Sequence, residues 1–338
     1  MTTLQGVTSP NPIALASSKG ANRTSDGALV PYIPTLACAL ALTIATIADA
    51  EALAPWPWII ALVFIGMPHG AMDWQVHRRT MPFATTRQCI VALRPYILWM
   101  FASLILLVVA PVLTCLAFFV LTAVHFGRAD IRDLPGGSDL LDRPVGQALA
   151  WSRGALVLAI PFSVDPVGAW QPFAIVTGVE LLLPPSIAEA FATSVLTVTA
   201  LSMAVTFALT RPRATSSRRF LIETAAACAL LSLTPPLFAV GCYFLFVHAF
   251  KHSTRLVRSP SLRLKDEGET VLQGLARLHK AATPFTVPAV ICVLAWATLL
   301  VAPWAVAIAS ASIGFYIIST LPHELLDHRA GRLEILRA

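Results

Sequence analysis

Long uncharged apolar runs recur along this 338-residue chain, and they constrain its fold more than any other feature. The chain is 57% hydrophobic and 12% charged, whereas a soluble domain is about 45–50% apolar and about 25% charged. A helix that crosses a bilayer core needs about 20 apolar residues. The runs do not alternate apolar with polar residues, which argues against a membrane β-barrel. We therefore predict an all-α polytopic bundle of transmembrane helices.

We predict about ten spans, within a range of eight to ten, in a single transmembrane domain over residues 29–330. Their approximate limits are 31–47, 56–74, 89–110, 112–127, 146–162, 186–210, 220–233, 237–252, 284–302 and 304–321. Residues 1–28 are rich in Ser, Thr, Asn and Gly, which predicts a disordered cytoplasmic tail, and 331–338 would be a short C-terminal tail. We expect a short helix within the loop 163–185 and an amphipathic surface helix over 266–280.

The distribution of basic residues orients the chain. If the N-terminus is inside, none of the 24 Lys and Arg residues falls in an outer connection. Because basic loops stay on the cytoplasmic side, we predict a multi-pass protein of the cell (inner) membrane with both termini cytoplasmic. The net charge of +6 is explained by these loops, so we expect no nucleic acid partner.

Histidines close four of the predicted spans, and in this orientation all four ends lie at one membrane face. His248 and His252 are four residues apart, which places them on one face of a helix, as two ligands of one metal require. His69, His125 and His323 close the other three spans. A lone intramembrane histidine more often joins helices by a hydrogen bond, but the four ends together predict a metal site. We expect no second polar cluster within the membrane.

Other residues near these ends have two readings. Asp73 follows His69 by four residues and Asp327 follows His323 by four, so each carboxylate is predicted to accept the outer N–H of that ring. An ordinary charge at a helix end explains them equally well. His77 and His279 lie beside basic residues and are predicted to be solvated.

Glycines near the same ends predict either close helix approach or room for a ligand. They are Gly66, Gly70 and Gly127. The six cysteines are scattered singly through apolar segments without a CxxC motif, so we predict packing residues.

These segments resemble motifs of the Brp/Blh family of membrane β-carotene 15,15′-dioxygenases, in the same order, from about residue 55 to 330. The motifs are Pro68-His69-Gly70-Ala71-Met72-Asp73, His125-Phe126-Gly127, His248-Ala249-Phe250-Lys251-His252 and Pro322-His323. The resemblance implies that O₂ cleaves the central 15,15′ double bond of β-carotene to give two all-trans-retinal molecules. It also implies Fe(2+) held by His69, His125, His248 and His252.

The resemblance further implies that His323 and Asp73 lie near the iron, either supporting the ligands or as alternative ligands, and we expect Asp327 there as well. We expect an apolar tunnel for the substrate, with walls from four aromatic residues: Trp74, Phe126, Phe246 and Phe250. The expected partners are β-carotene, O₂ and the lipid bilayer, with the retinal product passed to a rhodopsin.

Two other classes remain as alternatives. A membrane desaturase or hydroxylase with a non-haem iron pair needs several histidine boxes, and this chain has eight His with one HxxxH. A metal or proton transporter needs polar residues that continue to the outer side, where these spans are almost purely apolar.

Overall fold

The computed structural model describes residues 29–332, apart from 82, 135, 182 and 211–213, and the described residues contain helices and no strand. The predicted all-α fold is confirmed. The helices are η1 (Val30–Tyr32), α2 (Ile33–Ile47), α3 (Ala50–Leu53), α4 (Trp56–Phe64), α5 (Gly66–Ala71), α6 (Asp73–Thr80), α7 (Thr86–Ala92), α8 (Arg94–Val109), α9 (Pro111–Arg132), α10 (Gly137–Leu141), α11 (Pro144–Val164), α12 (Pro166–Thr177), α13 (Pro185–Thr210), α14 (Ala214–Leu233), α15 (Pro236–Cys242), η2 (Tyr243–Ala249), α16 (Phe250–Arg258), α17 (Val271–Ala297) and α18 (Trp304–Arg332).

Eight helical stretches among the described residues are long and apolar enough to cross a membrane. This number lies at the lower end of the expected range. The seventh and eighth predicted spans are helical, as α14 and as the run from α15 to α16, but they are not among the eight.

Some connections differ from the prediction. The loop 163–185 contains the expected short helix, α12. The surface helix expected over 266–280 is instead the beginning of α17, which continues without a break to Ala297. Residues 331 and 332 belong to α18 rather than to a tail, while the tail predicted at 1–28 and residues 333–338 lie outside the described part of the chain.

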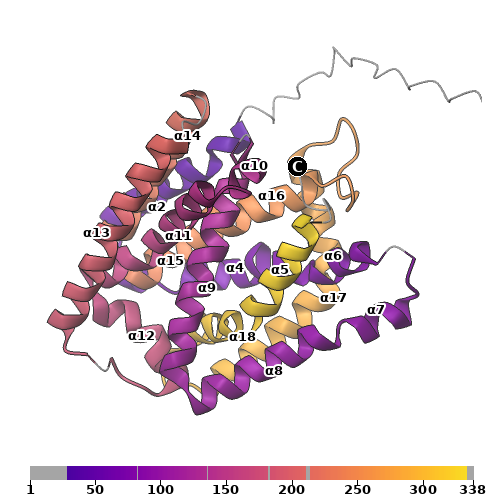
Figure 1. Cartoon of the computed structure of the whole chain (residues 1–338). Helices are drawn as coiled ribbons and strands as arrows, with labels where there is room; N and C mark the ends of the chain where they lie inside the picture. Colours follow the sequence, from indigo (N-terminus) through magenta and orange to yellow (C-terminus); the bar gives the residue numbers. More distant parts are fainter. Residues whose placement is uncertain (1–28, 82, 135, 182, 211–213, 333–338) are drawn as a thin grey trace, which may run out of the picture.

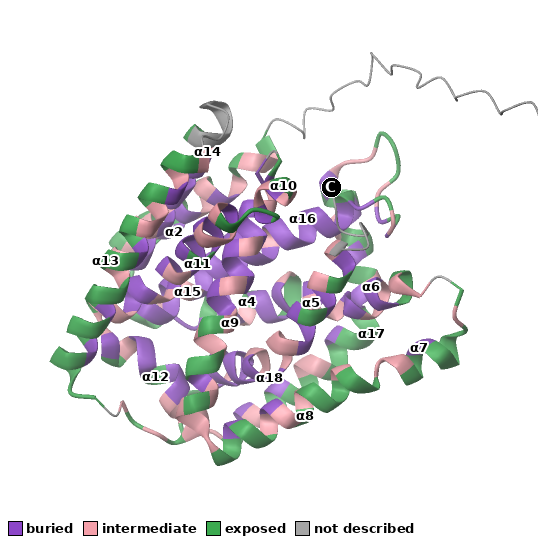
Figure 2. Ribbon diagram, in the orientation of Figure 1, coloured by how far each residue is buried: buried purple, intermediate pink, exposed green. Residues whose placement is uncertain are grey.

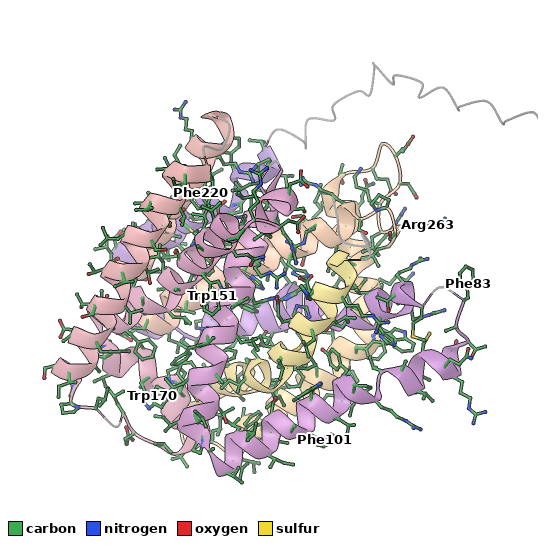
Figure 3. The ribbon with its side chains drawn as sticks, in the orientation of Figure 1. Phe83, Phe101, Trp151, Trp170, Phe220 and Arg263 are labelled. Carbon is green, nitrogen blue, oxygen red and sulfur yellow. The ribbon has the colours of Figure 1, made fainter. Side chains whose placement is uncertain are left out.

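The bundle has an exposed apolar rim around a buried centre. In Figure 1, α13 and α14 form one side and α8 runs along another, with α9 and α18 between them. Figure 2 shows exposed residues along α13 and α8 and buried residues along α15 and α16. Large side chains such as Phe101 of α8 lie on the outside (Figure 3). Exposed apolar rims are what helices facing lipid require.

The second predicted span is divided into short helices. Its segments α4, α5 and α6 meet at Ile65 and Met72, the residues that cap their ends. Gly66 begins α5, and a Cβ at this position would lie 2.7 Å from the ring of Phe244 in η2. The absence of a side chain at Gly66 therefore lets α5, which carries His69, pack closely on η2.

The helix with the HxxxH motif has an irregular middle. Residues Tyr243–Ala249 form a π-helix, η2, which joins α15 to α16. His248 lies in η2 and His252 lies in α16. π-Helical turns inside α-helices are frequent at functional sites, so this irregularity marks the segment that presents both histidines.

Two glycines bring α9 and α11 into backbone contact. A Cβ at Gly127 would lie 1.7 Å from the carbonyl oxygen of Ala150, and a Cβ at Gly154 would lie 1.8 Å from that of Ala123. No side chain fits between these helices, so the close approach predicted for Gly127 is confirmed. Gly70 differs, because its Cβ would meet nothing within 4 Å.

Candidate metal centre

Five imidazoles from separate helical segments meet inside the bundle. They belong to His69 of α5, His125 of α9, His248 of η2, His252 of α16 and His323 of α18, and all five are buried. Eight pairs of their ring centroids lie 4.7–6.2 Å apart. One ligand nitrogen from each of His125, His252 and His323 lies within 4.8 Å of the other two. Five histidines spread over the sequence therefore share one site.

The pattern of ring contacts gives the cluster a shape. His252 contacts the other four rings. Among ring contacts in the described part of the chain, the pairs His69/His125 and His248/His323 are missing, so the two members of each pair lie on opposite sides. The imidazoles of His69, His323, His125 and His248 thus form a closed cycle of neighbours. His252 contacts all four from one side of this cycle and caps it.

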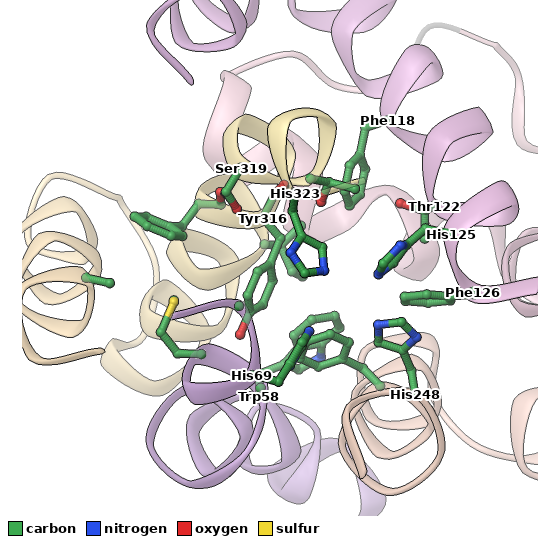
Figure 4. Close-up of a pocket in the computed structure, with 18 of the residues that line it drawn as sticks. Trp58, His69, Phe118, Thr122, His125, Phe126, His248, Tyr316, Ser319 and His323 are labelled. Carbon is green, nitrogen blue, oxygen red and sulfur yellow. Dashed lines mark hydrogen bonds between the residues drawn. The ribbon is translucent and has the colours of Figure 1, made fainter. Parts of the chain in front are cut away.

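A largely apolar cavity of about 310 Å³ adjoins this cycle. His69, His125, His248 and His323 line it and point toward a common centre (Figure 4), whereas His252 does not line it. The cap is therefore on the side away from the cavity, and the opposite side of the cluster is open to whatever the cavity holds. Cavities of this size and composition are typical of small-molecule sites.

Two of the four aromatic residues expected in the tunnel line the cavity. Trp74 and Phe126 do so, but Phe246 and Phe250 do not. Phe244 lies in the wall instead, four residues before His248, where a helix brings it to the same face as that ring. Phe246 and Phe250 are each two residues from His248 and so point elsewhere.

Oxygen atoms hold three of the rings by their Nδ1–H groups. His69 donates to the backbone carbonyl of Ile65 (3.2 Å), His125 donates to the carboxylate of Glu324 (2.6 Å), and His323 donates to Asp73 (2.8 Å). These bonds leave the Nε2 lone pair of each neutral ring free. Such outer partners orient metal-binding imidazoles and make them better donors.

The other two rings are held differently. The guanidinium of Arg255 donates to Nδ1 of His252 (2.9 Å), which places the proton of the neutral ring on Nε2. Nε2 of His252 could therefore bind a metal only if Arg255 released this contact. Within the described part of the chain, Nδ1 of His248 is buried without a hydrogen-bond partner. The same is true of Nε2 of His323 and of the cavity hydroxyls of Thr122 and Tyr316.

The carboxylates near the histidines are paired in a different way from the prediction. Asp73 accepts a hydrogen bond from His323 rather than from His69. Asp327, expected to support His323, forms an ion pair with Arg132 instead. The reason is that α5 ends at Ala71, so Asp73 begins a new helix and no longer follows the face of His69.

Two supporting residues were absent from the prediction. Glu324 lies beside His323 in sequence but pairs with His125 and with Arg128 (2.9 Å). Tyr96 donates from its hydroxyl to Asp73 (2.7 Å) and lines the cavity. The position of Glu324 directly after His323 could have pointed to it, whereas nothing in the sequence singles out Tyr96.

A second polar cluster lies within the bundle, and the expectation that none would exist was wrong. It contains two acids and two bases, all buried: Asp130, Arg153, Glu223 and Lys251. Arg153 and Lys251 lie 3.0 and 3.2 Å from Asp130. Lys251 also pairs with Glu223, and the hydroxyl of Tyr243 donates to Asp130 (2.8 Å). We call these four charged residues the ion cluster.

The ion cluster could have been predicted from the sequence. Glu223 and Arg153 are isolated charges inside predicted apolar spans, and isolated charges of opposite sign in neighbouring spans pair with one another. Lys251 lies between the two histidines of the HxxxH motif, so the ion cluster and the histidine cluster share one helical segment.

His77 and His279 were predicted to be solvated and the cysteines to be packing residues, and the structure agrees with this in part. His279 is exposed as expected, but His77 is buried and its Nε2 lies 3.1 Å from the carbonyl oxygen of Cys89. The cysteines are free, and four of the six are buried.

The residues of the histidine cluster fit a metal ion. Unpaired buried ring nitrogens, such as Nε2 of His323, are costly unless a partner occupies the space beside them. An all-imidazole donor set is typical of iron, copper, zinc and nickel rather than magnesium or calcium. A buried histidine group that can bind a metal is therefore present.

Comparison with known proteins gives a family match. Residues 60–328 match the family model described as beta-carotene 15,15'-dioxygenase. A relative from Halobacterium salinarum, described as probable beta-carotene 15,15'-dioxygenase Blh, is 29% identical over 274 residues, which cover 71% of this chain and 74% of the relative. No solved structure matches the chain. The matched region contains all five histidines of the cluster.

Proposed function

Because this chain belongs to the beta-carotene 15,15'-dioxygenase family, we propose that it splits the central 15,15′ double bond of β-carotene at an iron site formed by the histidine cluster. The enzyme is an oxidoreductase. In the proposed reaction the C=C bond breaks and two C=O bonds form, giving two molecules of all-trans-retinal. One O₂ supplies both aldehyde oxygens, so the reaction balances without an external electron donor.

The observation that carries this proposal is the position of the histidine cluster on the wall of an apolar cavity. The proposed ligands of Fe(2+) are His69, His125, His248 and, once Arg255 has released its ring, His252. His323 is a fifth candidate because its ring nitrogen is already oriented by Asp73. Bound iron would supply the redox chemistry that activates O₂. The open side of the cluster faces the cavity, so O₂ and the polyene would meet there.

The protein's own residues bind and orient the substrate. Lining residues on α18 run from Ile313 to His323, a rise of about 15 Å along the helix. Phe118 of α9 and Trp58 of α4 also line the cavity. These apolar walls would hold one half of the polyene away from water, with its central bond beside the histidines.

The wider setting is also a proposal. We assign residues 29–330 to one catalytic domain in the cell (inner) membrane, with both termini cytoplasmic. The retinal product would leave into the lipid and be passed to a rhodopsin. The apolar helices support a membrane location.

Expression in cells that make β-carotene tests the function. We expect the orange colour to fade and retinal to accumulate. The substitutions His69→Ala, His125→Ala, His248→Ala and His252→Ala should each abolish retinal formation and lower the iron content of the purified protein. Exposed His279 offers a matched control, since His279→Ala should leave both unchanged. Folded protein in a culture that stays orange would contradict the proposal.

A further inference from the structure

The most exposed residues of the cavity lining mark where the cavity comes closest to the surface of the bundle. Of the residues that line it, only Ile97 and Phe285 are exposed, at 43% and 42%. Ile97 belongs to α8 and Phe285 to α17, two helices that are long and apolar enough to cross a membrane. The surface at this point therefore faces lipid rather than water.

The opposite end of the cavity, which we call the closed end, has no exposed residue among its described lining. Its lining there includes Trp58, Pro172, Phe173 and Leu237, all of which are buried. The indole N–H of Trp58 donates to the carbonyl of Leu237 (2.8 Å), which holds this end together.

The exposed point lies near the basic ends of the two helices. Ile97 is three residues beyond Arg94 and Phe285 is five beyond Lys280, rises of about 4.5 and about 7.5 Å. Charged side chains at helix ends lie at the membrane interface. The opening is therefore just inside the hydrocarbon layer, at the end of the bundle where the histidines lie.

The wall of the opening contains a helix segment that can bend. The ring of Trp74 lies 5.9 Å from that of Phe285 and forms the inner side. Pro284 and Pro288 both lie inside α17, and each removes one backbone hydrogen bond from the helix. A helix that lacks two of these bonds within two turns bends more readily there. Ala289 follows Pro288 directly and lines the cavity one turn from Phe285.

From these observations we propose that the carotenoid enters sideways from the lipid through a mouth between α8 and α17, bounded by Ile97 and Phe285. This inference rests on the proposed function. A polyene that passes the mouth moves along Trp74 and Tyr96 to the histidines, and its leading half continues into the closed end. The two retinal molecules would leave by the same mouth, since both are apolar rods of half the length.

Blocking the mouth tests the route. The substitutions Ala289→Trp and Ile97→Trp place an indole in the passage from opposite sides. The matched control is Val287→Trp, which is on α17, 49% exposed and absent from the cavity wall. Each purified variant is reconstituted in lipid vesicles with increasing mole fractions of β-carotene. Retinal formation, iron content and unfolding temperature are then measured.

We expect the two mouth variants to lower kcat/KM for β-carotene by roughly tenfold or more, mainly through KM, while iron content stays at the wild-type level. Val287→Trp should behave as the wild type. Phe285→Ala, which widens the mouth, should lower KM or leave it unchanged. If Ala289→Trp fails to fold, Ile97→Trp still decides the result.

The two proposals fail in different ways. A wild-type enzyme that forms no retinal would contradict the proposed function. An active wild type with both mouth variants as active as Val287→Trp would overturn the lateral route alone.

Discussion

The histidine cluster and the ion cluster are both buried and share the helices α9 and α16, yet their atoms are paired in opposite ways. His125 and Asp130 both lie on α9, and Lys251 lies between His248 and His252. In the ion cluster, each charge lies beside an opposite charge. In the histidine cluster, Nδ1 of His248 and Nε2 of His323 lack a hydrogen-bond partner among the described residues, and four of the rings face a cavity. Burial of polar groups alone therefore does not identify a functional site. Buried polar atoms that lack a hydrogen-bond partner and lie beside a cavity do identify one.

The difference also suggests separate tasks. A paired set of charges contributes little net stability compared with apolar packing, but breaking it is costly. The ion cluster links α9, α11, α14 and α16, which include two of the helices that carry histidines. We infer that it sets how those helices lie against each other, and that the histidine cluster performs the chemistry.

The largest effect should follow from breaking the ion cluster. Lys251→Met leaves Asp130 and Glu223 with Arg153 as their only basic neighbour in the cluster. An uncompensated buried charge typically costs about 3–5 kcal/mol, so the free energy of unfolding in detergent should fall by that amount. The double variant Lys251→Met/Glu223→Gln removes one charge of each sign and should recover much of the loss. Equal instability of the two variants would mean that the charges are not coupled.

A smaller and more selective effect is expected at Glu324, which supports the histidine cluster. Glu324→Gln weakens the acceptor of His125, and loss of such an outer partner typically lowers metal affinity or activity about 10–100-fold. Iron affinity, measured by competition with a chelator, should fall far more than stability does. Asp266→Asn makes the same chemical change at an exposed carboxylate and serves as the control. An unchanged iron affinity in Glu324→Gln would count against a metal role for His125.

The smallest effects should come from two tyrosines that make the same bond in the two clusters. Tyr96 donates to Asp73 beside His323, and Tyr243 donates to Asp130 in the ion cluster, over 2.7 and 2.8 Å. Removing one such hydroxyl costs about 1 kcal/mol. Tyr96→Phe should weaken iron binding a few-fold with little change in stability, whereas Tyr243→Phe should lower stability and leave iron affinity unchanged. Identical profiles for the two variants would remove the distinction between the clusters.

Much of the fold could be predicted from the sequence, because lipid imposes a simple rule on it. Apolar stretches of sufficient length must be helical, since backbone groups have no other partners in hydrocarbon. The predicted spans agree with helical segments, and the five histidines lie together. The pairing of Asp73 with His323 could not be predicted, because a span that looked continuous is broken at Ile65 and Met72. Neighbours on different helices decide that Asp327 pairs with Arg132 and that Phe244, rather than Phe246 or Phe250, lines the described cavity.

What the sequence determined by itself was that the apolar spans are helical and that the histidines lie toward the ends of these spans, because hydrophobic length acts along a single helix. The tertiary structure alone decided the partners: Asp73 with His323, Glu324 with His125, and Lys251 with Asp130. These pairs are separated by 121 to 250 residues in the chain. Their contacts depend on how far each helix is rotated and shifted against its neighbours, which is set by packing such as that of Gly127 against Ala150.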